Sequence, residues 1–270
     1  MTRGAILGAL ALVLGGPAAA AEPAPWQVEL GAGVEQLDNG APDWRQVDLA
    51  LRHRFDAQRL GELTLRRAER YGRHDTELGL GVVWPLGESF VVGLRASTAG
   101  NAAFLPRRGA QADLNWRGPA GWVLGGGLTR NLYHTPDAPA TGSTLLRAGL
   151  ERYVGDWRFA GGLTRARLDG GSYANGWRAQ VDRFIGDGAR LGLALGGGRE
   201  LESAPQGVLS TRVESLALVG RWPLAESWAL VGEATWTRVS AFEQRIGDEV
   251  LSLPGGYRRN GIRLGVARDF

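Results

Sequence analysis

The sequence lacks cysteine and lysine, and both absences narrow the chemistry open to the chain. Without cysteine, no disulfide can hold the fold together, and no thiolate can act as a nucleophile or a metal ligand. All 31 basic residues are therefore arginines, and 28 acidic residues leave a formal net charge of only +3. Acidic and basic residues are interspersed rather than grouped in blocks, which argues against a nucleic-acid partner.

Long apolar runs are missing after the N-terminus. Arg3, an apolar run over residues 5–14 and alanines at 18–21 have the layout of a secretory signal peptide. We therefore expect 1–21 to be removed after export by the general secretory route, and 22–270 to form the exported domain. No later stretch reaches the roughly 20 residues of a membrane helix. If the domain crosses a membrane it must be a closed barrel, because only helices and closed barrels satisfy every backbone group in lipid.

From Trp26 onward, apolar residues alternate with polar or small residues, which is the pattern of β-strands. Most of the alternating segments have the length of about ten residues that a tilted strand needs to cross a bilayer. The pattern predicts an all-β, antiparallel, up-and-down transmembrane barrel of about 14 strands, with 12 as the alternative. The segments are 26–36, 44–55, 62–71, 76–84, 90–97, 109–117, 122–131, 143–154, 157–166, 177–185, 190–199, 212–222, 228–238 and 258–270. The third is the weakest, since 66–70 interrupts the alternation and allows a bulge or a projection above the membrane.

The connections between these segments alternate in length. Even-numbered connections are tight turns such as Gly155-Asp156, whereas odd-numbered ones are mostly longer, including 98–108, 200–211 and 239–257. Outer-membrane barrels show this asymmetry, with the short turns in the periplasm. An even strand count then places both termini in the periplasm as well.

Aromatic residues gather at the expected strand ends. Amphipathic rings are favoured at both interfaces of a bilayer, so the pattern predicts two aromatic girdles. The girdle at the short turns would contain Trp26, Trp84, Phe90, Trp116, Trp122, Trp157, Trp222 and Trp228, and the opposite girdle Trp44, Trp177 and Trp236. The chain closes with an alternating strand ending at Phe270, similar to the signal that barrels present to the barrel-assembly machinery. Arg268 departs from the apolar residue usual two positions before the end.

The stretch from Leu65 to Glu77, LRRAERYGRHDTE, resembles a motif of the YaiO family of outer-membrane β-barrels, and 196–202 adds a weaker match. The resemblance covers nearly all of 22–270. It implies a bacterial outer-membrane location, with the lipid bilayer as the surrounding partner, and a barrel of this size. It supplies no established activity and no catalytic residue. The charged residues of the first motif are then best interpreted as a structural network near the rim.

The expected inward positions carry charges of both signs. Such charges can pair to stiffen the wall, because unpaired charge in a narrow lumen is costly, or they can form a polar path for small solutes. Barrel closure would bring Arg263 near Glu29. The predicted lumen network is Glu29, Asp48, Arg52, Glu62, Arg95, Asp113, Arg117, Arg147, Glu151, Arg158, Arg178, Asp182, Glu233 and Arg263.

Candidate catalytic groups are few. His53 is expected to face outward near the short-turn interface, and His74 and His134 fall in expected surface loops. Three scattered histidines make a poor zinc site, and no cofactor motif is present, so we predict no catalytic, metal or cofactor residues. The sequence favours a non-enzymatic narrow channel, or an accessory for export or assembly of an envelope polymer. A small polar solute or an envelope glycan would be its partner. A lipid- or glycan-modifying enzyme and an adhesive surface protein using 239–257 are the alternatives.

Overall fold

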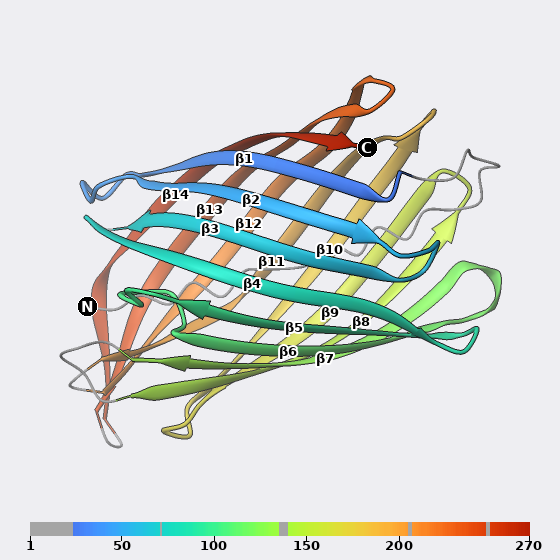
Figure 1. Ribbon diagram of the computed structural model, residues 1–270. Helices are drawn as coiled ribbons and strands as arrows, with labels where there is room; N and C mark the ends of the chain where they lie inside the picture. Colours follow the sequence, from blue (N-terminus) through green and yellow to red (C-terminus); the bar gives the residue numbers. More distant parts are fainter. Residues whose placement is uncertain (1–23, 71, 135–139, 205–206, 247–248) are drawn as a thin grey trace.

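The computed structural model describes residues 24–70, 72–134, 140–204, 207–246 and 249–270, so the expected signal peptide at 1–21 lies outside the described residues. Within them, fourteen strands form one closed sheet (Figure 1). Among the same residues, no helix is long and apolar enough to span a membrane. The strands are β1 Trp26–Leu37, β2 Trp44–Arg54, β3 Leu60–Arg70, β4 Arg73–Leu86, β5 Phe90–Ala99, β6 Arg108–Arg117, β7 Trp122–Tyr133, β8 Thr141–Val154, β9 Trp157–Leu168, β10 Tyr173–Ile185, β11 Ala189–Ala204, β12 Gly207–Ala225, β13 Trp228–Ile246 and β14 Glu249–Asp269.

Each strand pairs antiparallel with its neighbours in the sequence, and β1 pairs with β14 to close the barrel. The seam runs in continuous register from Gln27 opposite Asp269 to Leu37 opposite Arg259. At its end Trp26 and Phe270 exchange backbone hydrogen bonds, with N···O distances of 3.0 and 2.9 Å. The predicted up-and-down barrel of fourteen strands is confirmed. β1 begins and β14 ends at the same rim.

Two details differ from the expected strand boundaries. β3 continues to Arg70 and pairs with β2 and β4 without a register shift, so the interrupted alternation at 66–70 contains no bulge. The connections expected at 200–211 and 239–257 are mostly strand, because the β11–β12 and β13–β14 pairs extend far beyond the alternating segments. Hairpins outside the lipid need no apolar face, so period-two hydrophobicity gives no signal for them.

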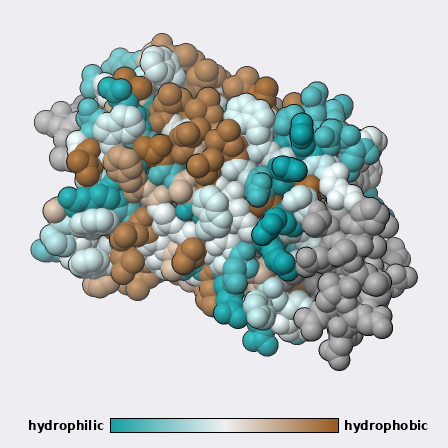
Figure 2. Space-filling view, turned by 180° about the vertical axis from the view of Figure 1, so that it is seen from behind, coloured by the Kyte–Doolittle hydropathy of each residue, from teal (hydrophilic) through white to brown (hydrophobic). Residues whose placement is uncertain are grey.

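The outward face of the barrel is a belt of exposed apolar side chains. Leu30, Leu80 and Leu163 have 56%, 59% and 67% of their surface exposed. In Figure 2, apolar residues occupy much of the middle of the rear face, and hydrophilic residues gather toward its ends. A continuous apolar surface of this size is not compatible with a water-soluble monomer but fits a bilayer.

Candidate functional site: the barrel lumen

Ion pairs line the lumen across the β1–β14 seam. Arg52 in β2 contacts Glu29 at 3.0 Å and Glu62 of β3 at 2.8 Å. Arg263 in β14 reaches Glu29 at 3.1 Å and also donates to the Asp48 carboxylate. Strand alternation turns all five side chains away from the apolar belt, and antiparallel pairing places them at similar depth. The seam is therefore bridged inside the lumen by guanidinium groups shared between carboxylates.

A second group of ion pairs lies on the opposite wall. Arg158 of β9 contacts Glu151 of β8 at 3.0 Å and Asp182 of β10 at 3.2 Å. Arg158 and Asp182 are buried, at 6% and 0% exposure, although they belong to a barrel wall without a packed protein core behind them. Desolvated charges of this kind need partners, and here each has one.

Between these groups, Arg147 of β8 contacts Asp113 of β6 at 2.7 Å, and Arg95 of β5 lies 3.7 Å from Glu62. The remaining three members of the predicted network, Arg117, Arg178 and Glu233, have no ion pair recorded within the described residues. Arg178 donates instead to the Gln180 side chain at 2.8 Å. Eleven of the fourteen predicted residues are thus brought together in ion pairs.

Several lumen residues were not predicted. Gln27 accepts from Arg52 at 2.7 Å, and Arg190 lies 3.9 Å from Asp182. Gln27 shares the parity of Glu29, so alternation alone could have identified it. Two further ion pairs, Arg66 with Glu77 at 3.0 Å and Arg259 with Glu35 at 2.7 Å, lie toward the rim opposite the strand termini. Arg66 and Glu77 belong to the YaiO-like motif, as the rim interpretation of that motif expects.

The β5–β6 connection folds inward at this rim. Ala102, Phe104 and Leu105 are buried, at 2–6% exposure, and pack with Ala68 and Ala99 on the inner face of the wall. Their packing places apolar side chains inside the lumen, above the part of the wall that the ion pairs line.

A single carboxylate fixes this inward connection. Asp75 of β4 is fully buried and accepts the backbone N–H groups of Ala103, Phe104 and Leu105 at 2.8, 2.8 and 2.7 Å. Each of the three hydrogen bonds has a charged acceptor and is therefore stronger than a hydrogen bond between neutral groups. Asp75 lies in the YaiO-like motif, and its contact explains why an acidic residue is needed there.

A second apolar cluster lies beside the first. Leu37, Trp44, Val213, Val239 and Tyr257 are all buried and come from β1, β2, β12, β13 and β14. We call the two clusters, together with Arg70 between them, the rim cluster.

Arg70 joins the two halves of the rim cluster. Its guanidinium lies 4.3 Å from the Trp44 ring centroid and 5.4 Å from that of Phe104, and Arg259 lies 4.6 Å from Trp44. Trp44 was predicted in the outer aromatic girdle; this is wrong, because only 4% of its surface is exposed and it faces the lumen. Stacking on two cations holds the indole inside.

The other predicted girdle residues lie on the outer face, 38–56% exposed. At the rim that carries the strand termini, arginines stack on the indoles: Arg59 over Trp84 at 4.6 Å and Arg268 over Trp228 at 5.1 Å. Arg268, the residue that departs from the usual terminal pattern, thus still covers an aromatic surface. The His53 ring lies against that of Trp26 in the same belt, with the ring centroids 4.2 Å apart and the planes tilted by 37°. Among the described residues, no group of histidine and acidic side chains could hold a metal ion.

The closed sheet, the apolar belt and the charged lumen define a transmembrane β-barrel of the outer-membrane type. The chain belongs to the YaiO family, since the YaiO membrane beta barrel domain matches residues 26–198. The expected resemblance is thereby confirmed, together with an outer-membrane barrel as the class of protein. None of the curated proteins compared with the chain matches it.

Solved structures share the fold. The CymD monoaromatic hydrocarbon channel aligns with a TM-score of 0.60 at 9% identity, covering 92% of this chain and 89% of its own. The Pseudomonas putida toluene transporter TodX gives 0.60 at 9%, with 92% and 90% covered. A bacterial polysaccharide outer membrane secretin gives 0.56 at 11%, with 91% and 98% covered. At these identities the likeness extends to the fold alone.

Proposed function

We propose that the protein is a non-enzymatic, narrow outer-membrane channel for small polar solutes. In this proposal the strand termini and short turns face the periplasm, and the rim cluster narrows the mouth that faces the outside. The observation that carries the proposal is the pairing of a charged wall with the rim cluster, which brings apolar side chains into the lumen at the rim opposite the strand termini. Some of these groups keep contact with the interior space: the side chains of Arg52, Arg95 and Arg147 are 26–28% exposed.

The sign of the lumen charges suggests what can pass. The predicted network contains seven arginines and seven carboxylates, so no net field of one sign selects anions or cations along the passage. Paired charges still offer hydrogen-bond donors and acceptors to a neutral polar solute. We therefore expect weak ion selectivity and a preference for small uncharged polar solutes over apolar ones.

The constriction supports a narrow passage rather than a wide pore. Phe104, Trp44 and Tyr257 bring three aromatic rings to the mouth of the lumen, and Arg70 lies between two of them. Hydrophobic constrictions limit flow by excluding water, so the wild-type barrel should conduct ions in small steps.

Planar-bilayer recording tests the proposal. We would compare the wild-type protein with a variant in which 100–106 is replaced by a two-residue turn, which removes the inward part of the β5–β6 connection. The variant should show clearly larger conductance steps. Asp169→Asn is the matched control, because it breaks an exposed ion pair with Arg130 at the same rim and leaves the rim cluster intact.

Small steps in the wild type, large steps in the shortened variant and no change in the control would support the channel. Liposome swelling with uncharged sugars would then give the solute size limit. A barrel that stays silent in all three forms would refute the channel and favour the accessory role in export of an envelope polymer.

A further inference from the structure

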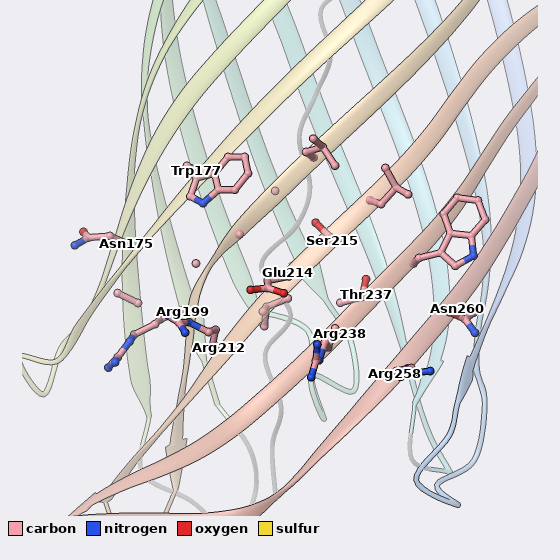
Figure 3. Close-up of a pocket in the computed structure, with 18 of the residues that line it drawn as sticks. Asn175, Trp177, Arg199, Arg212, Glu214, Ser215, Thr237, Arg238, Arg258 and Asn260 are labelled. Atoms are coloured by element: carbon pink, nitrogen blue, oxygen red, sulfur yellow. The ribbon is translucent and has the colours of Figure 1, made fainter.

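The outer wall of β10–β14 contains a hollow of about 1160 Å³ near the rim opposite the strand termini (Figure 3). It lies just beyond the apolar belt, where the polar surface of the barrel begins. Strand pairing organises its lining into rows that run across neighbouring strands. Each row has its own chemistry.

The row nearer the belt is apolar. Leu195, Leu216 and Trp236 are register partners across β11, β12 and β13, and Trp236 is 47% exposed. Trp177 of β10 lies one row further out, opposite Gly197, with 50% of its surface exposed. These side chains offer a surface for hydrocarbon at the edge of the membrane.

The next row is basic. Glu214, Arg238 and Arg258 are register partners across β12, β13 and β14, and Arg212 lies two residues further out on β12. All four side chains are exposed on the outer face. Three arginines thus meet one carboxylate in a strip three strands wide, in which neighbouring strands are about 4.8 Å apart.

These arginines differ from those of the opposite rim. There, Arg59, Arg152 and Arg183 each stack on an indole, at 4.6, 4.8 and 5.4 Å from the ring centroid. Within the described residues, the guanidinium groups of Arg212, Arg238 and Arg258 make no ion pair, hydrogen bond or ring contact; the backbone N–H of Arg258 donates to Asp38 Oδ1 at 2.7 Å. Their guanidinium groups remain available to an external anion.

A glycine shapes the hollow. On β11 the outward positions continue from Leu195 to residue 197, which is glycine, so β11 has no outward side chain at the centre of the lining. A Cβ on Gly197 would approach the Trp177 Nε1 atom to 3.0 Å, so the glycine allows the indole to lie across the strand. The recess therefore depends on specific residues of two adjacent strands.

We propose that this hollow binds lipopolysaccharide, the phosphorylated glycolipid of the outer leaflet. The phosphate groups contact Arg212, Arg238 and Arg258, because a guanidinium matches phosphate oxygens with two parallel hydrogen bonds. The acyl chains lie against the leucine and tryptophan row directly below. A free anion would use only the upper row, whereas a phosphorylated lipid uses both.

Binding of lipid A to the purified, detergent-folded barrel tests the proposal. The probes are bisphosphorylated lipid A and the same lipid after phosphatase treatment. The test variant combines Arg212→Gln, Arg238→Gln and Arg258→Gln. The matched control, with the same charge change on the outer face of the other rim, combines Arg59→Gln, Arg152→Gln and Arg183→Gln.

We expect the test variant to bind bisphosphorylated lipid A about 100-fold more weakly than the wild type, since a basic residue near an anionic lipid surface contributes about fivefold. The control variant should bind within about twofold of the wild type, because its arginines lie far from the hollow. Folding is checked by the heat-dependent shift in gel mobility. If the triple variant does not fold, Arg238→Gln alone should lower the affinity about fivefold.

Three results would overturn the proposal. These are equal losses in both triple variants, equal affinity for dephosphorylated lipid A, and full competition by inorganic phosphate at millimolar concentration. The last result would assign a simple anion site instead of a lipid site. The test is independent of conduction, because none of the substituted arginines faces the lumen.

Discussion

Replacing Asp75 with asparagine tests how the inward connection is held. The carboxylate is fully buried and accepts three backbone N–H groups, from Ala103, Phe104 and Leu105. Asparagine has nearly the same size, so the substitution leaves the packing of the rim cluster unchanged. It supplies only one acceptor oxygen, however, and turns an amide donor toward a backbone donor.

The size of the effect follows from these contacts. A hydrogen bond to a charged group contributes about 1.5–3 kcal/mol net, and the asparagine keeps at most two weaker, neutral bonds. We therefore expect the inward conformation to lose about 2–4 kcal/mol, which raises the population of the released connection about 30- to 1000-fold.

Hydrogen exchange measures that population directly. In lipid nanodiscs, the amides of residues 103–105 should exchange faster in Asp75→Asn by this factor, while amides of β5 and β6 stay protected. Asp169→Asn, at the same rim, should leave the exchange of 103–105 unchanged. Unaltered protection at 103–105 in a folded Asp75→Asn barrel would refute the role given to this carboxylate.

Further outcomes are expected at other positions. Arg263→Gln should lower the free energy of unfolding in lipid vesicles by about 3 kcal/mol, since it leaves two lumen carboxylates without their shared cation; a loss below about 0.5 kcal/mol would count against the seam network. Trp44→Ala should cost about 3–5 kcal/mol and enlarge the conductance steps, and unchanged steps would argue that the indole does not narrow the mouth. Arg130 donates two hydrogen bonds to Asp169 and so lowers the pKa of that carboxyl. The ion pair therefore stabilises the folded protein at neutral pH, and this stabilisation is lost as the pH falls through the lowered pKa. The stability difference between wild type and Asp169→Asn should accordingly shrink between pH 7 and pH 3, and a pH-independent difference would contradict the ion pair.

The membrane explains why so much of the barrel was predictable. Lipid imposes an apolar residue at every second position of a spanning strand, and this constraint is visible in the sequence without any knowledge of partners. The same alternation identified most of the lumen charges. Trp44 is instructive, because it lies three residues before the outward-facing Val47 and strict alternation already turns it inward. The position of Trp44 at a strand end suggested the aromatic girdle, but the alternation of inward and outward positions along β2 predicts its orientation correctly.

The inward β5–β6 connection could not be predicted in the same way. It depends on Asp75 meeting the backbone of residues 28–30 positions later in the chain, and backbone donors leave no signature in the sequence. Likewise, the strand extensions of β11–β14 continue beyond the alternating segments on which the sequence prediction rested. Both features belong to the rim, where the bilayer no longer dictates the pattern.

Arg263 has a consequence for how the barrel closes. Pairing β1 with β14 joins residues more than 220 positions apart, the most distant pairing in the sheet. A slip of one residue in that pairing would reverse every side chain of β14 and expose the guanidinium to lipid, leaving Asp48 without its cation and Glu29 with Arg52 alone. The correct alignment instead places one cation between two anions. The charge arrangement therefore disfavours a misaligned seam, because only the observed register keeps Arg263 inside the lumen between Glu29 and Asp48.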